Sequence, residues 1–301
     1  MLINTKQIFS QPRITKALLG VTQDEFQQLL PTFNQCLLQH RAELTPNRKR
    51  KIGGGRRGDL PTDEAKLIYI LLYLKLYPTY DALAVLTSHY RSKCGDSVKF
   101  LLPVLEKALG RHLVLPARHG SSLEDIFRDH PELKDVFIDG TERRVNKPKN
   151  LGSRDKLYSG KKKAHTRKSI VLCDERKFIH LLTQAKSGRR HDKRLADKQM
   201  LVRYIPESVT AWTDTGFQGL AKLHTNTMMP RKKTRKHPLT PEDKASNRII
   251  AGIRIVNEQA IGGMKRFRAA ADIYRNHRPN MDDQLMRLSA GLWNFHLKQT
   301  I

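Results

Sequence analysis

The chain has 301 residues, of which 56 are Lys or Arg and 29 are Asp or Glu, and its formal net charge at pH 7 is +27. So large a positive charge attracts polyanions and favours nucleic acid as the partner, although a ribosome-associated or generally adhesive basic protein would share it. Hydrophobic residues make up 39% of the chain, enough for a core of ordinary size, and the length suggests roughly two or three structural units.

Several other classes of protein are not expected. Cys36, Cys94 and Cys173 are widely separated, and no CxxC or Cys/His metal spacing occurs, so the sequence predicts neither a disulfide framework nor a zinc site. The first residues lead into no apolar segment of a secretory signal. The longest apolar run, 67–76, contains Lys75 and falls far short of the roughly 20 residues that span a bilayer. We therefore expect a soluble cytoplasmic protein without a membrane partner.

The N-terminal segment, residues 1–45, is predicted to be helical, because Phe26, Phe33 and Leu37 recur at helical spacing and suit packing or self-association. Residues 46–60 are rich in Gly and basic residues and are predicted to form a linker. Such an arm can follow phosphates or enter a minor groove, or it can be a solvated hinge. Its candidate DNA-binding residues are Arg48, Lys49, Arg50, Lys51, Arg56 and Arg57.

Residues 61–124 are predicted to form a helix-turn-helix-like DNA-binding domain. Its first helix covers residues 62–76, with acidic residues in the first turn, where they interact favourably with the helix dipole, and with Pro78 after its end. A second, short helix is expected over residues 80–86.

The third helix of this domain is expected to follow a turn at residues 91–95 and to start at Asp96 or Ser97, with Pro103 in its first turns. In a helix-turn-helix unit, the second helix of the pair presents its N-terminal residues to the major groove. Ser97 and Lys99 are the candidates for that role. A helical hairpin that only packs is the alternative.

The remainder, residues 125–301, is predicted to form a mixed sheet flanked by helices, so the fold class is α+β or mixed α/β with an all-helical N-terminal part. The predicted strands are a short buried one at 136–138, a hairpin of 166–173 and 178–183, and another at 208–213. Helical patterns occur within 188–204, 241–267 and 280–298.

Three acidic residues stand at the ends of apolar stretches: Asp139, Asp214 and Glu258. Both aspartates are predicted to end strands, and the glutamate lies on the long predicted helix. A lone aspartate at a strand end is more often a turn former, and a helical glutamate among basic residues more often belongs to a solvated stripe. Together the three suit metal chemistry. Mg²⁺ prefers hard oxygen ligands, and two ions about 4 Å apart stabilise both the attacking and the leaving oxygen of an in-line displacement.

Two basic residues share the helix face of Glu258: Arg254 four residues before it and Lys265 seven after it. A guanidinium grips a phosphate bidentately, whereas an ammonium acts as a point charge. We therefore expect Arg254 to orient Glu258 or the scissile phosphate, and Lys265 to hold the end of the DNA.

Four segments follow one another along the chain: Phe137-Ile138-Asp139-Gly140-Thr141-Glu142, Tyr158 to Thr166, Gly188 to Asp192, and Thr213-Asp214-Thr215-Gly216-Phe217. Their order and spacing resemble those of DDE-superfamily transposases of bacterial insertion sequences. Arg254, Glu258 and Lys265 resemble the Arg-x3-Glu-x6-Lys block of that family, with Ala251 where a tyrosine often stands. Residues 53–109 resemble the helix-turn-helix module often found ahead of the catalytic domain, although residues 88–94 replace its usual apolar turn.

The resemblance implies an RNase H-like fold in which Asp139, Asp214 and Glu258 hold two Mg²⁺ ions, with Mn²⁺ able to replace them. Asp139 would bridge both ions, and the other two carboxylates would each hold one. Supporting residues are expected in the same segments: Glu142 as the partner of a nearby basic residue, and Asp192, next to His191, as the cap of the following helix.

Two basic runs fit the same scheme. Lys161, Lys162, Lys163, His165 and Lys168 flank the predicted hairpin, and a second run lies between the second and third carboxylates (Arg231, Lys232, Lys233, Arg235 and Lys236). Such residues contact backbone phosphates, which set position and affinity. Each one alone is equally consistent with a solvated surface.

The predicted function is that of a Mg²⁺-dependent DNA transposase, which binds transposon ends, cleaves them and joins the 3′-hydroxyl end to target DNA. A catalytically silent DNA-binding protein derived from such an enzyme is one alternative, and a basic RNA-binding protein is another. The expected partners are double-stranded DNA and, because two ends must be joined, further copies of the chain. The expected location is the cytoplasm, in association with the nucleoid.

Overall fold

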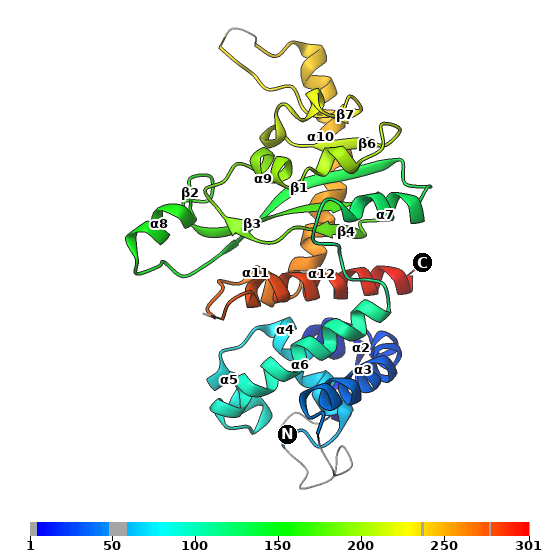
Figure 1. Ribbon diagram of the computed structural model, residues 1–301, viewed down its shortest axis with the longest axis vertical. Helices are drawn as coiled ribbons and strands as arrows, with labels where there is room; N and C mark the ends of the chain where they lie inside the picture. The colour runs from blue at the N-terminus through cyan, green and yellow to red at the C-terminus, as the bar shows by residue number, and fades with distance from the viewer. Residues whose placement is uncertain (1–4, 48–58, 236–237, 277, 301) are drawn as a thin grey trace. The chain divides into compact units, whose positions relative to one another are not determined.

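A computed structural model describes residues 5–47, 59–235, 238–276 and 278–300 of the chain (Figure 1). The chain divides into two compact units. Unit 1 comprises residues 1–115, 265–272 and 284–301, and unit 2 comprises residues 116–264 and 273–283. Within the described ranges, no helix is both long enough and apolar enough to cross a membrane.

Unit 1 consists of helices that surround one buried helix. They are α1 (Thr5–Ile8), α2 (Pro12–Leu19), α3 (Gln23–Leu44), α4 (Asp63–Leu76), α5 (Tyr80–Thr87), α6 (Arg91–Arg111), α11 (Arg268–Ala271) and most of α12 (Met281–Thr300). Residues 67–74 of α4 are buried on every face of the helix. A helix without a polar face needs neighbours all around it, and α4 contacts α2, α3, α6 and α11.

Helix α6 begins earlier than the sequence predicts. Its first residue is Arg91, with Tyr90 at the N-cap position, so the turn expected at 91–95 is helical instead. The apolar stripe explains the difference, since Cys94 and Val98 are buried at helical spacing and extend the helix by more than one turn. Gly95 costs such a helix only about 1 kcal/mol. Pro103, expected in the first turns, lies in the helix interior.

The two candidate reading residues consequently occupy other positions on α6. Ser97 and Lys99 lie in its second and third turns rather than at its N-terminus. The first turn carries Arg91, Ser92 and Lys93, which are exposed.

Unit 2 is built on a mixed sheet of seven strands among the described residues. The strands are β1 (Asp135–Arg144), β2 (Tyr158–Ser159), β3 (Ala164–Cys173), β4 (Ile179–Leu182), β5 (Lys186–Ser187), β6 (Thr210–Thr213) and β7 (Thr227–Met228). The order is β2-β3-β1-β6-β7, and β4 and β5 also pair with β3. β1 is antiparallel to β3 and parallel to β6. This arrangement confirms the predicted α+β architecture with a mixed sheet.

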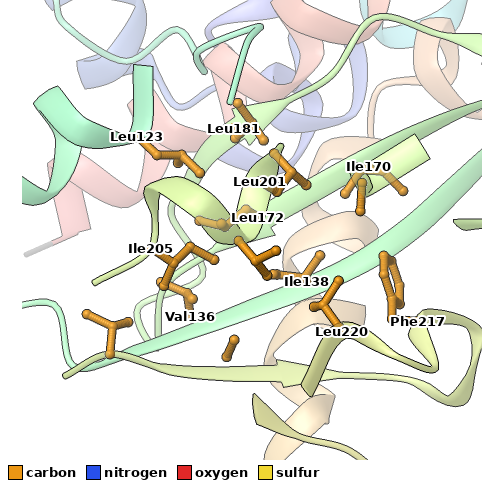
Figure 2. Packing of buried hydrophobic residues seen from close by; sticks show 14 of the residues in the cluster. Leu123, Val136, Ile138, Ile170, Leu172, Leu181, Leu201, Ile205, Phe217 and Leu220 are labelled. Atoms are coloured by element: carbon orange, nitrogen blue, oxygen red, sulfur yellow. The ribbon is translucent and has the colours of Figure 1, made fainter. Parts of the chain in front are cut away.

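Helices and short 3-10 turns cover this sheet. They are α7 (Ser122–Asp129), α8 (Leu151–Leu157), α9 (Asp192–Lys198), α10 (Pro241–Lys265), η1 (Leu201–Tyr204), η2 (Thr215–Phe217) and η3 (Leu220–Lys222). Leu123 of α7, Leu201 of η1 and Phe217 of η2 pack on one face of the sheet, against Ile138 and Leu172 (Figure 2). Helix α10 crosses the opposite face (Figures 1 and 2).

The alternation of side chains along β1 decides which residues face which helices. Val136 and Ile138 belong to the apolar core under α7 and η1, so Gly140 and Glu142 continue that face. Phe137 and Asp139 point to the face that α10 crosses. The prediction that Asp139 ends a strand beside a turn is wrong, because β1 continues to Arg144 in antiparallel pairing with β3.

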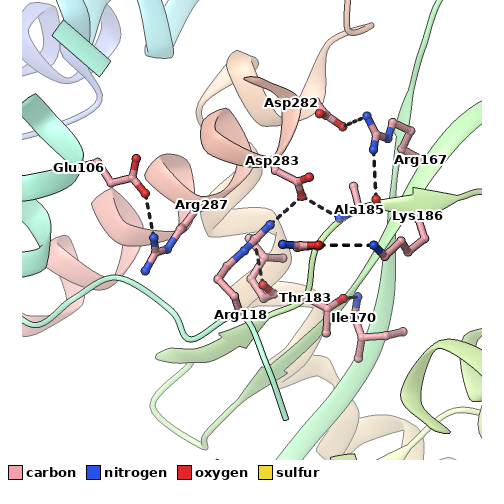
Figure 3. A network of polar contacts seen from close by, with 12 residues as sticks. Glu106, Arg118, Arg167, Ile170, Thr183, Ala185, Lys186, Asp282, Asp283 and Arg287 are labelled. Atoms are coloured by element: carbon pink, nitrogen blue, oxygen red, sulfur yellow. Dashed lines mark hydrogen bonds and ion pairs between the residues drawn. The ribbon is translucent and has the colours of Figure 1, made fainter. Parts of the chain in front are cut away.

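The last segment of unit 2, residues 273–283, is fastened to the sheet by polar contacts (Figure 3). Asp283 accepts hydrogen bonds from the Arg118 guanidinium and from the backbone N–H of Ala185, both at 2.7 Å. Asp282 pairs with Arg167 at 2.8 Å. Because these groups are largely buried, each charge depends on its partner for stabilisation.

The compact units differ from the expected division into 1–45, 46–60, 61–124 and 125–301. Most of α12 belongs to unit 1, where Leu288 and Phe295 are buried and Asn294 hydrogen-bonds the Val114 carbonyl at 2.9 Å. The amphipathic pattern of this helix identifies an apolar face but not the element that covers it.

Candidate active site

Asp139 and Asp214 lie side by side at the end of the parallel pairing between β1 and β6. The last registered pair of these strands is Ile138 with Thr213, and each aspartate is the next residue of its chain segment. The Oδ1 atom of Asp139 accepts a hydrogen bond from the Gly140 N–H, and that of Asp214 accepts one from the Gly216 N–H, both at 2.7 Å. Each carboxylate is thereby held, through one of its oxygens, by the backbone of its own chain segment.

The electrostatics of the pair disfavours two bare negative charges. The pKa of Asp139 is raised to about 6, chiefly by burial and also by the neighbouring Asp214 carboxylate, while the Gly140 hydrogen bond and the Arg254 guanidinium oppose the rise. A carboxylate in such a position is stabilised by an added cation.

Helix α10 brings a cation to the same face. The Nη2 atom of Arg254 lies 3.8 Å from Oδ2 of Asp139, and both side chains are mostly buried. Glu258 lies one helical turn further along α10, and its side chain is exposed. Lys265 is the last residue of α10. Asn257, beside Glu258, is buried.

The donors at this site are chemically suited to a divalent cation such as Mg²⁺ or Mn²⁺. Carboxylate oxygens are the ligands these ions prefer, and burial together with the Asp214 carboxylate raises the pKa of Asp139, so a bound cation would stabilise its ionised form. Among the side chains in the described ranges, no three His, Cys, Asp or Glu groups are already arranged around one point to hold a metal ion. The exposed Glu258 is the carboxylate that would complete the set.

A second polar cluster lies on the other face of β1. The buried Lys168 ammonium contacts the Glu142 carboxylate at 3.3 Å and the Asp192 carboxylate at 2.9 Å, and it donates to the Arg190 carbonyl at 3.0 Å. Thr166 donates a hydrogen bond to Glu142 at 2.6 Å. The basic partner of Glu142 is thus Lys168. Because Lys168 is buried, it is not placed to contact phosphates, although the sequence predicts that role for its basic run.

Asp192 has a different position from the one predicted. Helix α9 begins with Asp192, and His191 occupies the N-cap position without a side-chain cap hydrogen bond. Asp192 is therefore not the cap, and its carboxylate turns to Lys168. His191 is exposed. The sequence motif Gly-x-x-His-Asp marked this segment, but no local pattern revealed that a lysine on β3 would meet it.

The remaining candidate DNA-binding residues belong to other segments of the chain than Asp139 and Asp214. Lys161, Lys162 and Lys163 are exposed in the connection between β2 and β3, and His165 packs against the Tyr158 ring with 5.6 Å between ring centroids. Arg231, Lys232, Lys233 and Arg235 are exposed. Arg48, Lys49, Arg50, Lys51, Arg56, Arg57 and Lys236 lie outside the described residues.

Neighbouring carboxylates on two parallel chain segments, faced by an arginine, suit enzymes that act on phosphate esters with metal ions. The family model described as "DDE superfamily endonuclease" matches residues 138–294, just over half of the chain, and the chain belongs to this family. It is 27% identical over 249 residues to a probable transposase for insertion sequence element IS702 from Microchaete diplosiphon. The matched region covers 83% of this chain and 86% of that relative. No solved structure matches. The predicted resemblance to insertion-sequence DDE transposases is confirmed, and such a family implies DNA as the substrate.

Proposed function

We propose that this protein is an active DNA transposase, which binds transposon ends, cleaves them with divalent metal ions and joins the 3′-hydroxyl end to target DNA. The observation that carries the proposal is the adjacency of Asp139 and Asp214 on parallel strands, with Arg254 of α10 at 3.8 Å from Asp139. The sheet, with β1 antiparallel to β3 and parallel to β6, supports an RNase H-like catalytic domain.

In this proposal Asp139, Asp214 and Glu258 are the residues that would hold two Mg²⁺ ions. The ions supply stabilisation of the attacking and leaving oxygens of an in-line displacement. Asp139 and Asp214 are held by backbone hydrogen bonds, so they need little reorganisation, whereas the exposed Glu258 turns toward them from the next turn of α10. Arg254 orients Glu258 or the scissile phosphate, and Lys265 holds the end of the DNA.

The DNA contacts are assigned to three basic regions. These are the linker residues 48–57, the first turns of α6 with Ser97 and Lys99, and the connection between β1 and β3. Helix α5, the three residues 88–90 and α6 have the order and spacing of a helix-turn-helix. Because two DNA ends must be joined, the protein is expected to act as a homo-oligomer on DNA. Its expected location is the cytoplasm, in association with the nucleoid.

Glu258→Gln provides the test of the metal site. Because the substitution keeps the size of the side chain but removes its charge, we expect metal-dependent nicking of end-containing DNA to fall by at least about a hundredfold. Binding of the same DNA should change by less than about threefold, because phosphate contacts of basic residues provide most of the affinity. Single-turnover nicking and a DNA-binding titration measure the two effects.

Glu242→Gln is the matched control, since Glu242 is also exposed on α10 but lies in its first turn. It should nick like the unmodified protein. Equal nicking by the Glu258 and Glu242 variants would remove Glu258 from the site. A wild-type protein that binds end DNA but never nicks it would favour a catalytically silent DNA-binding protein. A protein that binds RNA more tightly than DNA would favour a basic RNA-binding protein.

The connection between β1 and β3 is expected to contact the DNA backbone. Replacing Lys161 and Lys162 together by alanine should reduce the slope of log affinity against log salt by up to about 1.8, since each phosphate neutralised contributes about 0.9. The double variant Arg13→Ala/Lys16→Ala on α2, which also removes two exposed charges, serves as control. Equal slopes for both variants and wild type would make these lysines solvated surface residues.

A further inference from the structure

A buried lysine lies directly behind the carboxylate pair. Lys168 is 6% exposed, and its ammonium is enclosed by Glu142, Asp192 and the Arg190 carbonyl. Glu142 and Lys168 are registered partners on β1 and β3. Because side chains alternate along β1, this cluster and Asp139 lie on opposite faces of the same strand.

The Asp192 carboxylate lies close to the backbone of the candidate active site. A methyl group added at Gly140 would lie 2.5 Å from Oδ1 of Asp192, and one added at Gly216 would lie 3.1 Å from Oδ2. Gly140 follows Asp139 and donates to it, and Gly216 donates to Asp214. One carboxylate therefore lies close to both short backbone segments that hold the two site aspartates.

We propose that Lys168 and Asp192 form a positioning pair that sets the spacing between Asp139 and Asp214 for metal binding. Lys168 draws Asp192 against Gly140 and Gly216, and its charge offsets a third carboxylate that would otherwise repel the incoming substrate. This inference rests on the proposed function, and it assigns to Lys168 a role that does not involve contact with DNA.

The chemistry of burial supports a role beyond stability. Replacing a buried ion pair by apolar residues of similar volume is often neutral or stabilising, so a sheet needs no such pair in order to fold. A small error in the position of a ligand, in contrast, lowers metal affinity and rate. Outer partners of metal ligands typically contribute about 10–100-fold to either quantity.

Gly140→Ala tests the proposal without removing any charge, because the added methyl group displaces the Asp192 carboxylate. Gly110→Ala, near the end of α6, is the matched control, since a methyl group there would meet only the Leu115 side chain, at the ordinary contact distance of 3.6 Å. Asp192→Asn is the second variant; it keeps the shape and an acceptor for Lys168, and it remains informative if Gly140→Ala fails to fold.

Three quantities separate positioning from mere structure: the affinity of the DNA-free protein for Mn²⁺ by calorimetry, the single-turnover nicking rate, and the melting temperature. We expect Gly140→Ala and Asp192→Asn to weaken Mn²⁺ binding and to slow nicking by about tenfold or more each. The affinity for end DNA should stay within about twofold, because the phosphate contacts that dominate it are untouched. Gly110→Ala should match wild type in Mn²⁺ affinity, nicking rate and affinity for end DNA.

Variants that melt earlier but bind Mn²⁺ and nick DNA like wild type would overturn the inference and leave the pair a structural one. That result is distinct from failure of the proposed function, in which wild-type protein itself shows no metal-dependent nicking.

Discussion

Replacing Asp139 by asparagine is expected to abolish metal-dependent nicking of DNA and, at the same time, to raise the free energy of unfolding of the metal-free protein by up to about 3 kcal/mol. The two effects have one cause. The pKa of Asp139 is raised from its ordinary 3.8 to about 6 by burial and by Asp214, so its ionised form is less stable in the folded protein than in the unfolded chain.

The pH dependence of this effect follows from the direction of the shift. An acid whose pKa is raised on folding lowers stability progressively as pH rises from its ordinary pKa to the raised one, and by a constant amount above. The stabilising effect of Asp139→Asn should therefore be absent near pH 3 and complete above about pH 7. Denaturant titrations without metal at several pH values measure it.

The control for this experiment is Asp129→Asn, an exposed aspartate at the end of α7. It should leave the nicking rate unchanged and the free energy of unfolding within about 0.5 kcal/mol of wild type. If Asp139→Asn nicked DNA normally, Asp139 would have no place in the site. If it lost activity and also lost stability, Asp139 would be a structural residue rather than one held in an unfavourable state for function.

Asp283→Ala is expected to lower the free energy of unfolding by about 3 kcal/mol, because it leaves the Arg118 guanidinium without its buried counter-charge. Asp283 is 16% exposed and Arg118 14% exposed, and the same carboxylate also accepts the Ala185 N–H. Figure 3 shows these contacts converging on the start of α12. Equilibrium unfolding in denaturant measures the loss.

A surface ion pair provides the comparison. Asp125 and Arg128 on α7 lie 2.8 Å apart but are 65% and 70% exposed, and Asp125→Ala should cost less than about 1 kcal/mol. A similar small loss for Asp283→Ala would mean that water replaces its contacts, and residues 273–283 would not be anchored by this carboxylate.

The adjacency of Asp139 and Asp214 could be anticipated only in part from the sequence. Apolar runs before each aspartate indicate buried strands, and these strands are present. The periodicity of a strand does not indicate which strand pairs with it, however, so the parallel register of Ile138 with Thr213 is known only from the structure. The same limit applies to Lys168, whose neighbours in sequence suggested phosphate contacts but whose cross-strand partner is Glu142.

Boundaries were harder to predict than the existence of elements. The sequence predicts that α6 starts at Asp96 or Ser97, because residues 91–95 include a glycine and suit a turn, whereas burial of Cys94 extends the helix to Arg91. Strands β2, β5 and β7 have two residues each, too few for any alternation to be recognised. Their positions follow from pairing with longer strands.

The connection between β1 and β3 has a consequence for how such a protein can diversify. Its ends leave the sheet at the registered pair Arg144 and Thr166, so they are fixed beside each other whatever lies between them. The entropy of closing a loop grows only with the logarithm of its length, by about 0.6 kcal/mol for each doubling. This connection, with α8 and its lysines, can therefore be lengthened, shortened or exchanged between relatives while the sheet that holds Asp139 keeps its register.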